Sequence, residues 1–321
     1  GKLILQRAIG DADLAGQFGL TLDEVQSRLA KSKAQLLSYR NTRVRPGTDD
    51  KVLTFWNGLM LSAIAQAARV FKDERYLEVA QRNADFLLTN LWKEGRLRRS
   101  WRNGRVSQAG FLEDYAALVL GLFDLYQADF DIHWYQAAYQ LTEEMIQRYG
   151  DPAGGFFDTP EEADPLLIRP KEIQDNATPS GNALAVEALL RMAAFSENEE
   201  WRKLAEKALS LTAGYARDYP LAFGRWLSAA DYFLSPTRQI AIIGDLQGKG
   251  TKDFLRVINK RYRPNTVVAV SNLPLPKGAP ALLANRPMVG GKTTVYVCEG
   301  FVCKQPVRSV TALRKALSRV R

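Results

Sequence analysis

The chain has 321 residues, of which 46% are hydrophobic, and it carries a net charge of +9 with two cysteines and one histidine. This length provides for one large or two ordinary domains with a substantial core, and every apolar run is too short to span a membrane. The Lys and Arg residues are spread along the chain, which argues against nucleic-acid binding. The start GKLILQRAIGDADLAG lacks the apolar stretch of a secretory signal, and the scarcity of cysteine favours a reducing compartment. We therefore expect a cytoplasmic protein without a membrane segment.

An amphipathic helix is predicted over residues 22–39, and three pairs of helices follow it. In each pair a helix that is apolar nearly all round precedes one with a single apolar stripe: 56–71 and 76–92, 112–128 and 134–149, 180–195 and 201–216. A helix that is apolar on all sides needs cover on all sides, whereas a striped helix can face water. The alternation predicts two layers of helical hairpins, an (α/α) toroid portion over residues 1–236. The N-termini of the inner helices should then meet at one mouth.

The character of the sequence changes after Pro236. Apolar runs at 238–245, 265–271 and 293–300 predict strands, and amphipathic stretches at 251–262 and 310–320 predict helices. Strand, helix and strand in succession indicate a small α/β subdomain over residues 237–321. The expected fold is thus mainly α, a ring of helical hairpins with a C-terminal α/β appendage.

Polar and aromatic residues gather at the predicted starts of the three inner helices. The first start brings Asp50, Lys51, Trp56 and Asn57, the second Glu113, Asp114 and Tyr115, and the third Asp175, Asn176, Ser180 and Asn182. Aromatic faces stack on sugar rings, and acids and amides bind hydroxyl groups, so this combination suits a polyhydroxylated ligand. Arg169 and Lys171 precede the third start and are further candidates for ligand binding in the same cavity.

Paired carboxylates that flank a glycosidic bond can act as acid and base. The candidates for this catalytic role are Asp114, Asp50, Asp175 and Glu113. Helix capping is the structural alternative, since acids are favoured in the first turn of any helix. Capping leaves Gly58 and Gly181 unexplained, and these glycines indicate close packing or access for a ligand. Successive helical residues point about 100° apart, so we predict that Asp114 faces the cavity while Glu113 caps or pairs locally.

The two cysteines, Cys298 and Cys303, are separated by four residues. This spacing departs from the redox Cys-x-x-Cys pattern, and two thiols alone do not complete a zinc site. A reversible disulfide and two partly buried thiols are both open, and we favour the thiols. We expect no metal and no cofactor.

Four stretches of the chain, taken in order, resemble one known family: RVRPGTDDKVLTFWNGLMLSAIA, GFLEDYAALVLGLFDLY, RPKEIQDNATPSGNALA and VYVCEGFVCKQPV. They are similar to the C-terminal half of the thioredoxin-domain-containing proteins of the spermatogenesis-associated protein 20 type. The resemblance covers nearly the whole chain. It implies a toroid like those of six-hairpin glycosidases and N-acylglucosamine 2-epimerases, without the family's thioredoxin-like domain, and it gives no reaction. About eight ring helices fall between residues 22 and 234, fewer than six hairpins require. We therefore predict an incomplete ring that is completed by self-association or by an upstream chain.

Three functions remain open at this point. The first is a carbohydrate-active enzyme, a glycoside hydrolase with paired carboxylates, and the second is a non-catalytic module that binds a saccharide or serves as a scaffold. The third, a sugar epimerase or isomerase, is disfavoured because the epimerases of this fold use histidines, whereas His133 alone is present and starts an outer helix. Carboxylates about 5–10 Å apart in an open cleft favour hydrolysis, while acids held in caps and salt bridges favour binding.

Overall fold

The computed structural model describes residues 5–162, 168–300 and 302–318, and the chain divides into two compact units, residues 1–50 and 51–321. The smaller unit holds α1 (Asp11–Phe18) and α2 (Leu22–Asn41), which pack against each other. Thr21 caps α2 through a capping box with Glu24, and the predicted helix over 22–39 is confirmed. Across the described ranges, each helix is too short or too polar to cross a bilayer.

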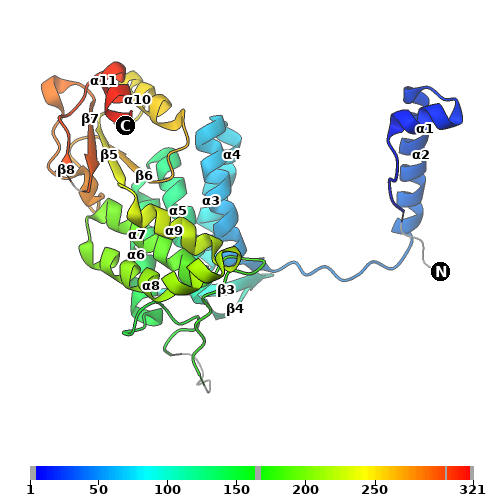
Figure 1. The fold of residues 1–321 in the computed structure, drawn as a ribbon, viewed down its shortest axis with the longest axis horizontal. Coiled ribbons are helices and arrows are strands. Elements are labelled where there is room, and N and C mark those ends of the chain that lie inside the picture. Colours follow the sequence, from blue (N-terminus) through cyan, green and yellow to red (C-terminus); the bar gives the residue numbers. More distant parts are fainter. Residues whose placement is uncertain (1–4, 163–167, 301, 319–321) are drawn as a thin grey trace. The chain divides into compact units, whose positions relative to one another are not determined.

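The larger unit contains the predicted helical hairpins (Figure 1). Their bounds are α3 (Thr54–Phe71) with α4 (Glu74–Asn90), α5 (Leu112–Asp129) with α6 (Ile132–Tyr149), and α7 (Gly181–Ser196) with α8 (Glu199–Asp218). A 3-10 turn, η1 (Pro220–Ala222), leads into α9 (Gly224–Leu234), which packs on α7 and α8. The predicted helices thus agree with the structure to within about two residues at each end.

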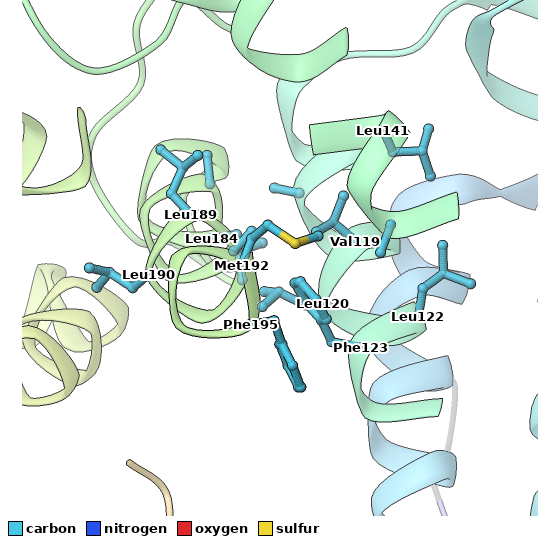
Figure 2. Close-up of a cluster of buried hydrophobic side chains, with 14 of the residues drawn as sticks. Val119, Leu120, Leu122, Phe123, Leu141, Leu184, Leu189, Leu190, Met192 and Phe195 are labelled. Carbon is cyan, nitrogen blue, oxygen red and sulfur yellow. The ribbon is translucent and has the colours of Figure 1, made fainter. Parts of the chain in front are cut away.

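The inner layer consists of α3, α5 and α7, with α5 in contact with both of the others. Both α5 and α7 are buried over nearly their whole length, and side chains such as Phe123 and Phe195 fill the space between them (Figure 2). The first inner helix differs, because α3 exposes Trp56, Met60 and Val70. The expected mainly α fold of helical hairpins is confirmed, and we call the three consecutive hairpins α3–α4, α5–α6 and α7–α8 the arc. One flank of α3, its first inner helix, is exposed to solvent.

All three inner helices end in the same way. Lys72, Phe130 and Glu197 follow α3, α5 and α7, and each adopts a left-handed conformation with φ near +60° (56°, 61° and 55°). A left-handed residue at this position stops a helix and turns the chain sharply. Each outer helix then begins on a capping side chain, Asp73, Asp131 or Asn198. These short connections make the hairpins antiparallel.

A small antiparallel sheet connects the first two hairpins. It comprises β1 (Val52–Leu53), β2 (Trp92–Lys93), β3 (Arg96–Arg102) and β4 (Arg105–Ala109). Asn103 and Gly104 both have positive φ, 50° and 79°, and form the tight turn between β3 and β4. An Asn-Gly pair between two short strands is a strong sequence signal for such a turn.

The C-terminal part forms a sheet with strand order β6-β5-β7-β8. Its elements are β5 (Arg238–Ile243), α10 (Lys249–Asn259), β6 (Thr266–Ser271), η2 (Ala281–Leu283), η3 (Val289–Gly291), β7 (Thr294–Glu299), β8 (Val302–Cys303) and α11 (Val310–Leu317). Along β5, Ile240 and Ile242 share a core with α10 and α11, whereas Ala241 and Ile243 belong to the core of the hairpins. One sheet face therefore carries helices and the other packs on the arc.

The α/β part and the hairpins belong to one compact unit. Gln127 of α5 accepts a hydrogen bond from the backbone N–H of Val268 in β6, and Gln239 of β5 donates to the carbonyl of Ala194. The change from helices to α/β structure occurs where it was predicted, after α9. A separate domain beginning at residue 237 stays a prediction.

The expectation of two free thiols is wrong, because Cys298 and Cys303 form a disulfide. The antiparallel pairing of β7 with β8 sets the two residues directly opposite each other. Spacing along the sequence did not reveal this register, since it depends on where the chain turns between the two strands.

Candidate functional site

The N-termini of α3, α5 and α7 lie together, and we call this region the mouth. Asp114 of α5 accepts a hydrogen bond from the backbone N–H of Phe55 in α3, with an N···O distance of 2.9 Å. A Cβ atom placed on Gly181 at the start of α7 would lie 3.1 Å from the backbone N of Glu113. The predicted meeting of the inner-helix N-termini is confirmed.

The expected local pairing of Glu113 is found, whereas Asp114 does not take the position expected for it. The fully buried Asp114 carboxylate also accepts from the backbone N–H of Phe111, so it caps its own helix and ties it to α3. Burial raises the pKa of Asp114 to about 7, while the two backbone donors and Arg99 oppose that rise. Glu113 is the partly exposed acid and pairs with Arg99 at 2.8 Å. The prediction that Asp114 faces a cavity is wrong, because its carboxylate serves backbone amides.

The polar residues around the start of α7 also serve the backbone. Asp175 accepts from the N–H groups of Ser180 and Arg225, at 2.9 and 2.7 Å. Ser180 caps α7, and the buried amide of Asn182 both donates to and accepts from the backbone of Phe156. These side chains hold the long loop before α7 in place.

Three other candidates stabilise that same loop or its surroundings. Arg169 lies over the ring of Phe157 and donates to the Thr159 carbonyl at 2.6 Å, and Lys171 pairs with Asp151 and donates to the Gly154 carbonyl. Asn176 is exposed, and its side chain accepts from the next residue's backbone N–H.

Asn57 and Trp56 of α3 and Tyr115 of α5 have different surroundings. Asn57 donates to the Leu53 carbonyl and accepts from Asn83, and the Tyr115 hydroxyl accepts from Leu97 N–H and donates to Glu144. Burial raises the pKa of Tyr115 to about 12, so its hydroxyl stays protonated. Trp56 is 60% exposed.

Asp50 and Lys51 lie where the two compact units meet along the chain. Asp50 is the last residue of the N-terminal unit and Lys51 is the first of the larger one. The roles expected for these two residues remain predictions.

The glycines at the mouth are explained by helix packing. A Cβ on Gly58 would lie 2.7 Å from the backbone carbonyl carbon of Ala117, and one on Gly121 would lie 2.8 Å from the oxygen of Gly58. Such distances require glycine on both helices, so α3 and α5 cross in backbone contact. Of the two explanations offered by the sequence, close packing accounts for Gly58 and Gly181.

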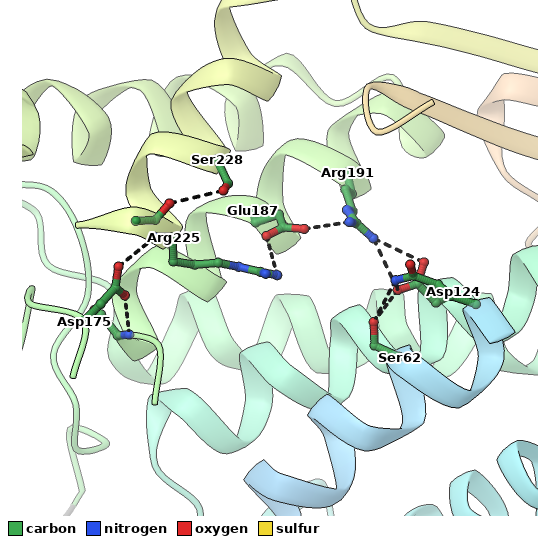
Figure 3. Close-up of polar contacts among 10 residues, drawn as sticks. Ser62, Asp124, Asp175, Glu187, Arg191, Arg225 and Ser228 are labelled. Carbon is green, nitrogen blue, oxygen red and sulfur yellow. Dashed lines mark hydrogen bonds and ion pairs between the residues drawn. The ribbon is translucent and has the colours of Figure 1, made fainter. Parts of the chain in front are cut away.

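A second polar group lies further along the inner helices, and we call it the inner-face cluster. Its members are Ser62 and Gln66 of α3, Asp124 of α5, Glu187 and Arg191 of α7, and Arg225 of α9 (Figure 3). Arg191 bridges the two acids, at 3.3 Å from Asp124 and 2.7 Å from Glu187. Burial alone would lower the pKa of Arg191, but Glu187 and Asp124 raise it above its ordinary value.

The remaining contacts complete an alternating chain of charges. Arg225 pairs with the other oxygen of Glu187 at 2.5 Å, and Asp124 accepts from Ser62 at 2.5 Å and from Gln66 at 2.9 Å. Because the backbone N–H of Arg225 binds Asp175, this residue links the inner-face cluster to the mouth. The cluster is fully cross-linked and is held by four different helices.

All members of the cluster except Asp124 line a cavity of about 610 Å³, which we call the inner-face cavity. Its walls include Ser62, Gln66, Glu187, Arg191, Arg225 and Asp231 from the helices, and Tyr262 and Asn265 from the loop after α10. Sequence reasoning missed this site. The available signal was a charge inside an otherwise apolar helix, as with Asp124, or an acid and a base four residues apart in one, as with Glu187 and Arg191.

Comparison with known proteins supports the family resemblance, although the sequence matches none of the protein-family models. Spermatogenesis-associated protein 20 of Homo sapiens is 31% identical over 323 residues, which cover 94% of this chain and 40% of that protein. The protein of the same name from Rattus norvegicus is 32% identical over 321 residues, with the same shares. An uncharacterized Caenorhabditis elegans protein is 26% identical over 328 residues, which cover 99% of this chain and 45% of that one.

The chain is thus homologous to spermatogenesis-associated protein 20 over nearly its whole length, and the resemblance predicted from the four motifs is confirmed. It spans 40% of the length of these relatives.

Some solved structures have a similar arrangement of helices. Cellobiose 2-epimerase from Spirochaeta thermophila has a TM-score of 0.43 and 18% identity, covering 50% of this chain and 43% of that one. A GH76 α-mannanase from Bacteroides thetaiotaomicron has a TM-score of 0.41 and 15% identity, and the match covers 54% of this chain and 44% of the mannanase. A family 105 glycoside hydrolase from C. acetobutylicum has a TM-score of 0.40 and 12% identity, and the match covers 62% of this chain and 59% of the hydrolase. Similarity at this level assigns no role to any residue.

Proposed function

We propose that this chain is the ligand-binding portion of a carbohydrate-active toroid and that the inner-face cavity holds a small polyhydroxylated ligand. The observation that carries the proposal is the cavity of about 610 Å³ whose walls combine the inner-face cluster with aromatic and amide side chains. Pockets of this size accommodate a small molecule, and a few fixed polar groups set its orientation. Glu187 and Arg191 come from the buried helix α7, which fixes the positions of these two charged groups.

The chemistry of the walls suits hydroxyl groups. Glu187 has carboxylate oxygens that accept hydrogen bonds, and Arg225 has a guanidinium that donates them. The ring of Tyr262, which is 89% exposed, lines the same cavity and offers a face for stacking on a sugar ring. Because Arg191 and Arg225 already hold Glu187, a ligand would meet groups whose positions are set in advance.

Hydrolysis by paired acids is the alternative, and the geometry supports it less well. At the mouth, Asp114 and Asp175 accept from backbone amides and Glu113 pairs with Arg99. On the inner face, Arg191 bridges Asp124 and Glu187. Acid–base hydrolysis requires one carboxyl group to donate a proton to the leaving oxygen while the other acts on the opposite side. Acids engaged in this manner favour binding over hydrolysis.

The test is a binding screen of the purified chain against a library of glycans and small metabolites by calorimetry. A compound that binds in the inner-face cavity should lose affinity with Glu187→Gln and keep it with Glu200→Gln, which removes a charge from an exposed ion pair. Loss of binding with Trp56→Ala, and not with Glu187→Gln, would place the ligand at the mouth and contradict the proposal. Assaying turnover of the same compounds separates a hydrolase from a binding module.

The open flank of α3 supports a further part of this proposal, that the arc is completed by a second copy or by an upstream chain. Trp56, Met60 and Val70 recur on one side of α3 and are 57–60% exposed. An apolar stripe of this kind ordinarily marks a contact surface. Light scattering of the chain with and without Met60→Gln tests self-association, and a monomer in both cases leaves the upstream chain as the partner to examine.

A further inference from the structure

A basic recess of about 310 Å³ adjoins the inner-face cavity, between the hairpins and the loop that follows α10. Its charged walls are Arg69 of α3, Asp124 of α5, Arg191 of α7, and Lys260, Arg261 and Arg263 of the loop. The recess thus gathers five cationic side chains around one carboxylate. This excess of positive charge needs an explanation, because like charges in a confined space repel one another.

The single carboxylate has little capacity left for these cations. Asp124 already accepts hydrogen bonds from Ser62, Gln66 and Arg191. Arg191 in turn is shared with Glu187, which lies on the side of the inner-face cavity. The charges of the inner-face cluster are therefore matched among themselves, without Arg69.

Among the two recess cations that the inner helices contribute, Arg69 is the one without an ion-pair partner in the described part of the chain. Within the described ranges its side chain makes no hydrogen bond and no ion pair. Burial lowers the pKa of Arg69 and the neighbouring Arg191 lowers it further, while Asp124 opposes both effects. A basic residue in the last turn of a helix ordinarily complements the helix dipole from the surface. Arg69 instead lines a recess next to a second guanidinium, which is the arrangement of an anion site.

We propose that the basic recess binds the phosphate group of a small phosphorylated ligand. A guanidinium presents parallel N–H donors that match two phosphate oxygens, and a phosphate monoester carries enough negative charge to be shared by several cations. The cations on the loop, Lys260 and Arg261, are exposed and line the same recess as Arg69. A phosphate held between them would join the loop to the inner helices.

This inference rests on the proposed function in one respect, the identity of the rest of the ligand. The recess and the inner-face cavity share Gln66, Arg191, Tyr232, Tyr262 and Pro264 as walls. A phosphate in the recess and hydroxyl groups in the inner-face cavity would then belong to one molecule, a phosphorylated sugar or polyol. A nucleic-acid backbone is disfavoured, because it contacts cations on an open surface, whereas the Arg191 side chain is only 20% exposed.

The first experiment titrates the full chain with inorganic phosphate by calorimetry and follows its thermal melting. Phosphate should bind and raise the melting temperature, and Arg69→Gln should weaken binding about tenfold or more, as expected for one lost charge-assisted contact. The control, Arg82→Gln, removes the same charge from an exposed position on α4 and should leave phosphate binding unchanged. Without phosphate, Arg69→Gln should melt no lower than the parent chain, because Arg69 lacks a partner. Phosphate binding that Arg69→Gln does not weaken would overturn the proposal, as would no binding at all.

The second experiment compares a hexose 6-phosphate with the parent hexose, so that the two proposals fail separately. If the hexose phosphate binds more tightly than inorganic phosphate and loses affinity with both Arg69→Gln and Glu187→Gln, both proposals are supported. If only Arg69→Gln matters, the phosphate site stands and the proposed function fails. If the neutral hexose binds as well as its phosphate and only Glu187→Gln matters, the phosphate site fails. A short single-stranded oligonucleotide that binds more tightly than any of these in an Arg69-dependent manner would replace the small ligand with a nucleic acid.

Discussion

The mouth and the inner-face cluster both collect acids, amides and basic residues around α3, α5 and α7, but the two regions use these residues differently. At the mouth the partners are backbone amides: Asp114 binds Phe111 and Phe55, and Asp175 binds Ser180 and Arg225. On the inner face the partners are other side chains, as in the Asp124–Arg191–Glu187 chain. Helix starts expose unsatisfied N–H groups, whereas helix middles have none to offer. Polar side chains in the middle of a buried helix must therefore form hydrogen bonds and ion pairs with one another. Glu187 and Arg191 do so and still line the inner-face cavity, where a ligand could contact them.

The largest expected effect is on the inner-face cluster. Arg191→Met removes the bridge between two carboxylates that are almost fully buried, and we expect it to destabilise the fold by about 3–5 kcal/mol. Chemical denaturation measures the loss. As a control, Arg75→Gln breaks an exposed ion pair with Asp73 and should have no measurable effect. Equal results for the two variants would show that the inner-face charges are not coupled as the structure indicates.

The next effect concerns the pH dependence of Asp114. Its folded pKa of about 7 lies above the ordinary aspartate value of 3.8, so the folded state binds the proton more tightly than the unfolded state. This contribution to stability is complete below pH 3.8 and is lost as the pH rises through 7. Relative to Asp114→Asn, the parent chain should lose about 2–3 kcal/mol between pH 5 and pH 8.

Denaturation of both proteins at the two pH values checks this expectation. A parent chain that instead gains stability relative to Asp114→Asn as the pH rises would mean that the donors around the carboxylate outweigh its burial.

A smaller effect is expected from the helix contact below the mouth. Gly58→Ala places a methyl group within 2.7 Å of the α5 backbone, and overpacking of this kind costs about 1–3 kcal/mol. Gly214→Ala in α8 is the matched control, because a Cβ there meets no atom within 4 Å. Alanine should stabilise that exposed helical position by about 0.5–1 kcal/mol. Opposite signs in thermal melts are expected, and stabilisation by both substitutions would contradict the close contact of α3 and α5.

The smallest effect is expected for Trp56→Ala, because this side chain is largely exposed. The free energy of unfolding should change by no more than about 0.5 kcal/mol. A loss several times larger in denaturation would show that another part of the chain covers Trp56.

The sequence by itself determined the elements and their layering. All-round apolar helices such as 112–128 must be buried, and stretches with one apolar stripe such as 201–216 can form an outer layer, so the hairpins followed from periodicity alone. The Asn103-Gly104 turn and the strands of the α/β part followed from local rules as well. These features depend on residues that are close in the sequence.

Only the tertiary structure decided which polar side chains are available to a ligand. The Asp114 carboxylate is occupied by a hydrogen bond from the backbone N–H of Phe55, because Gly58 allows α3 to approach α5 closely. Asp124 and Glu187 come together because α5 and α7 are neighbours, and Arg69 shares the basic recess with the loop after α10. Hydrogen bonds and ion pairs require distances of a few ångströms between groups that lie 50 or more residues apart, and such distances are fixed by packing, which no local pattern of residues encodes.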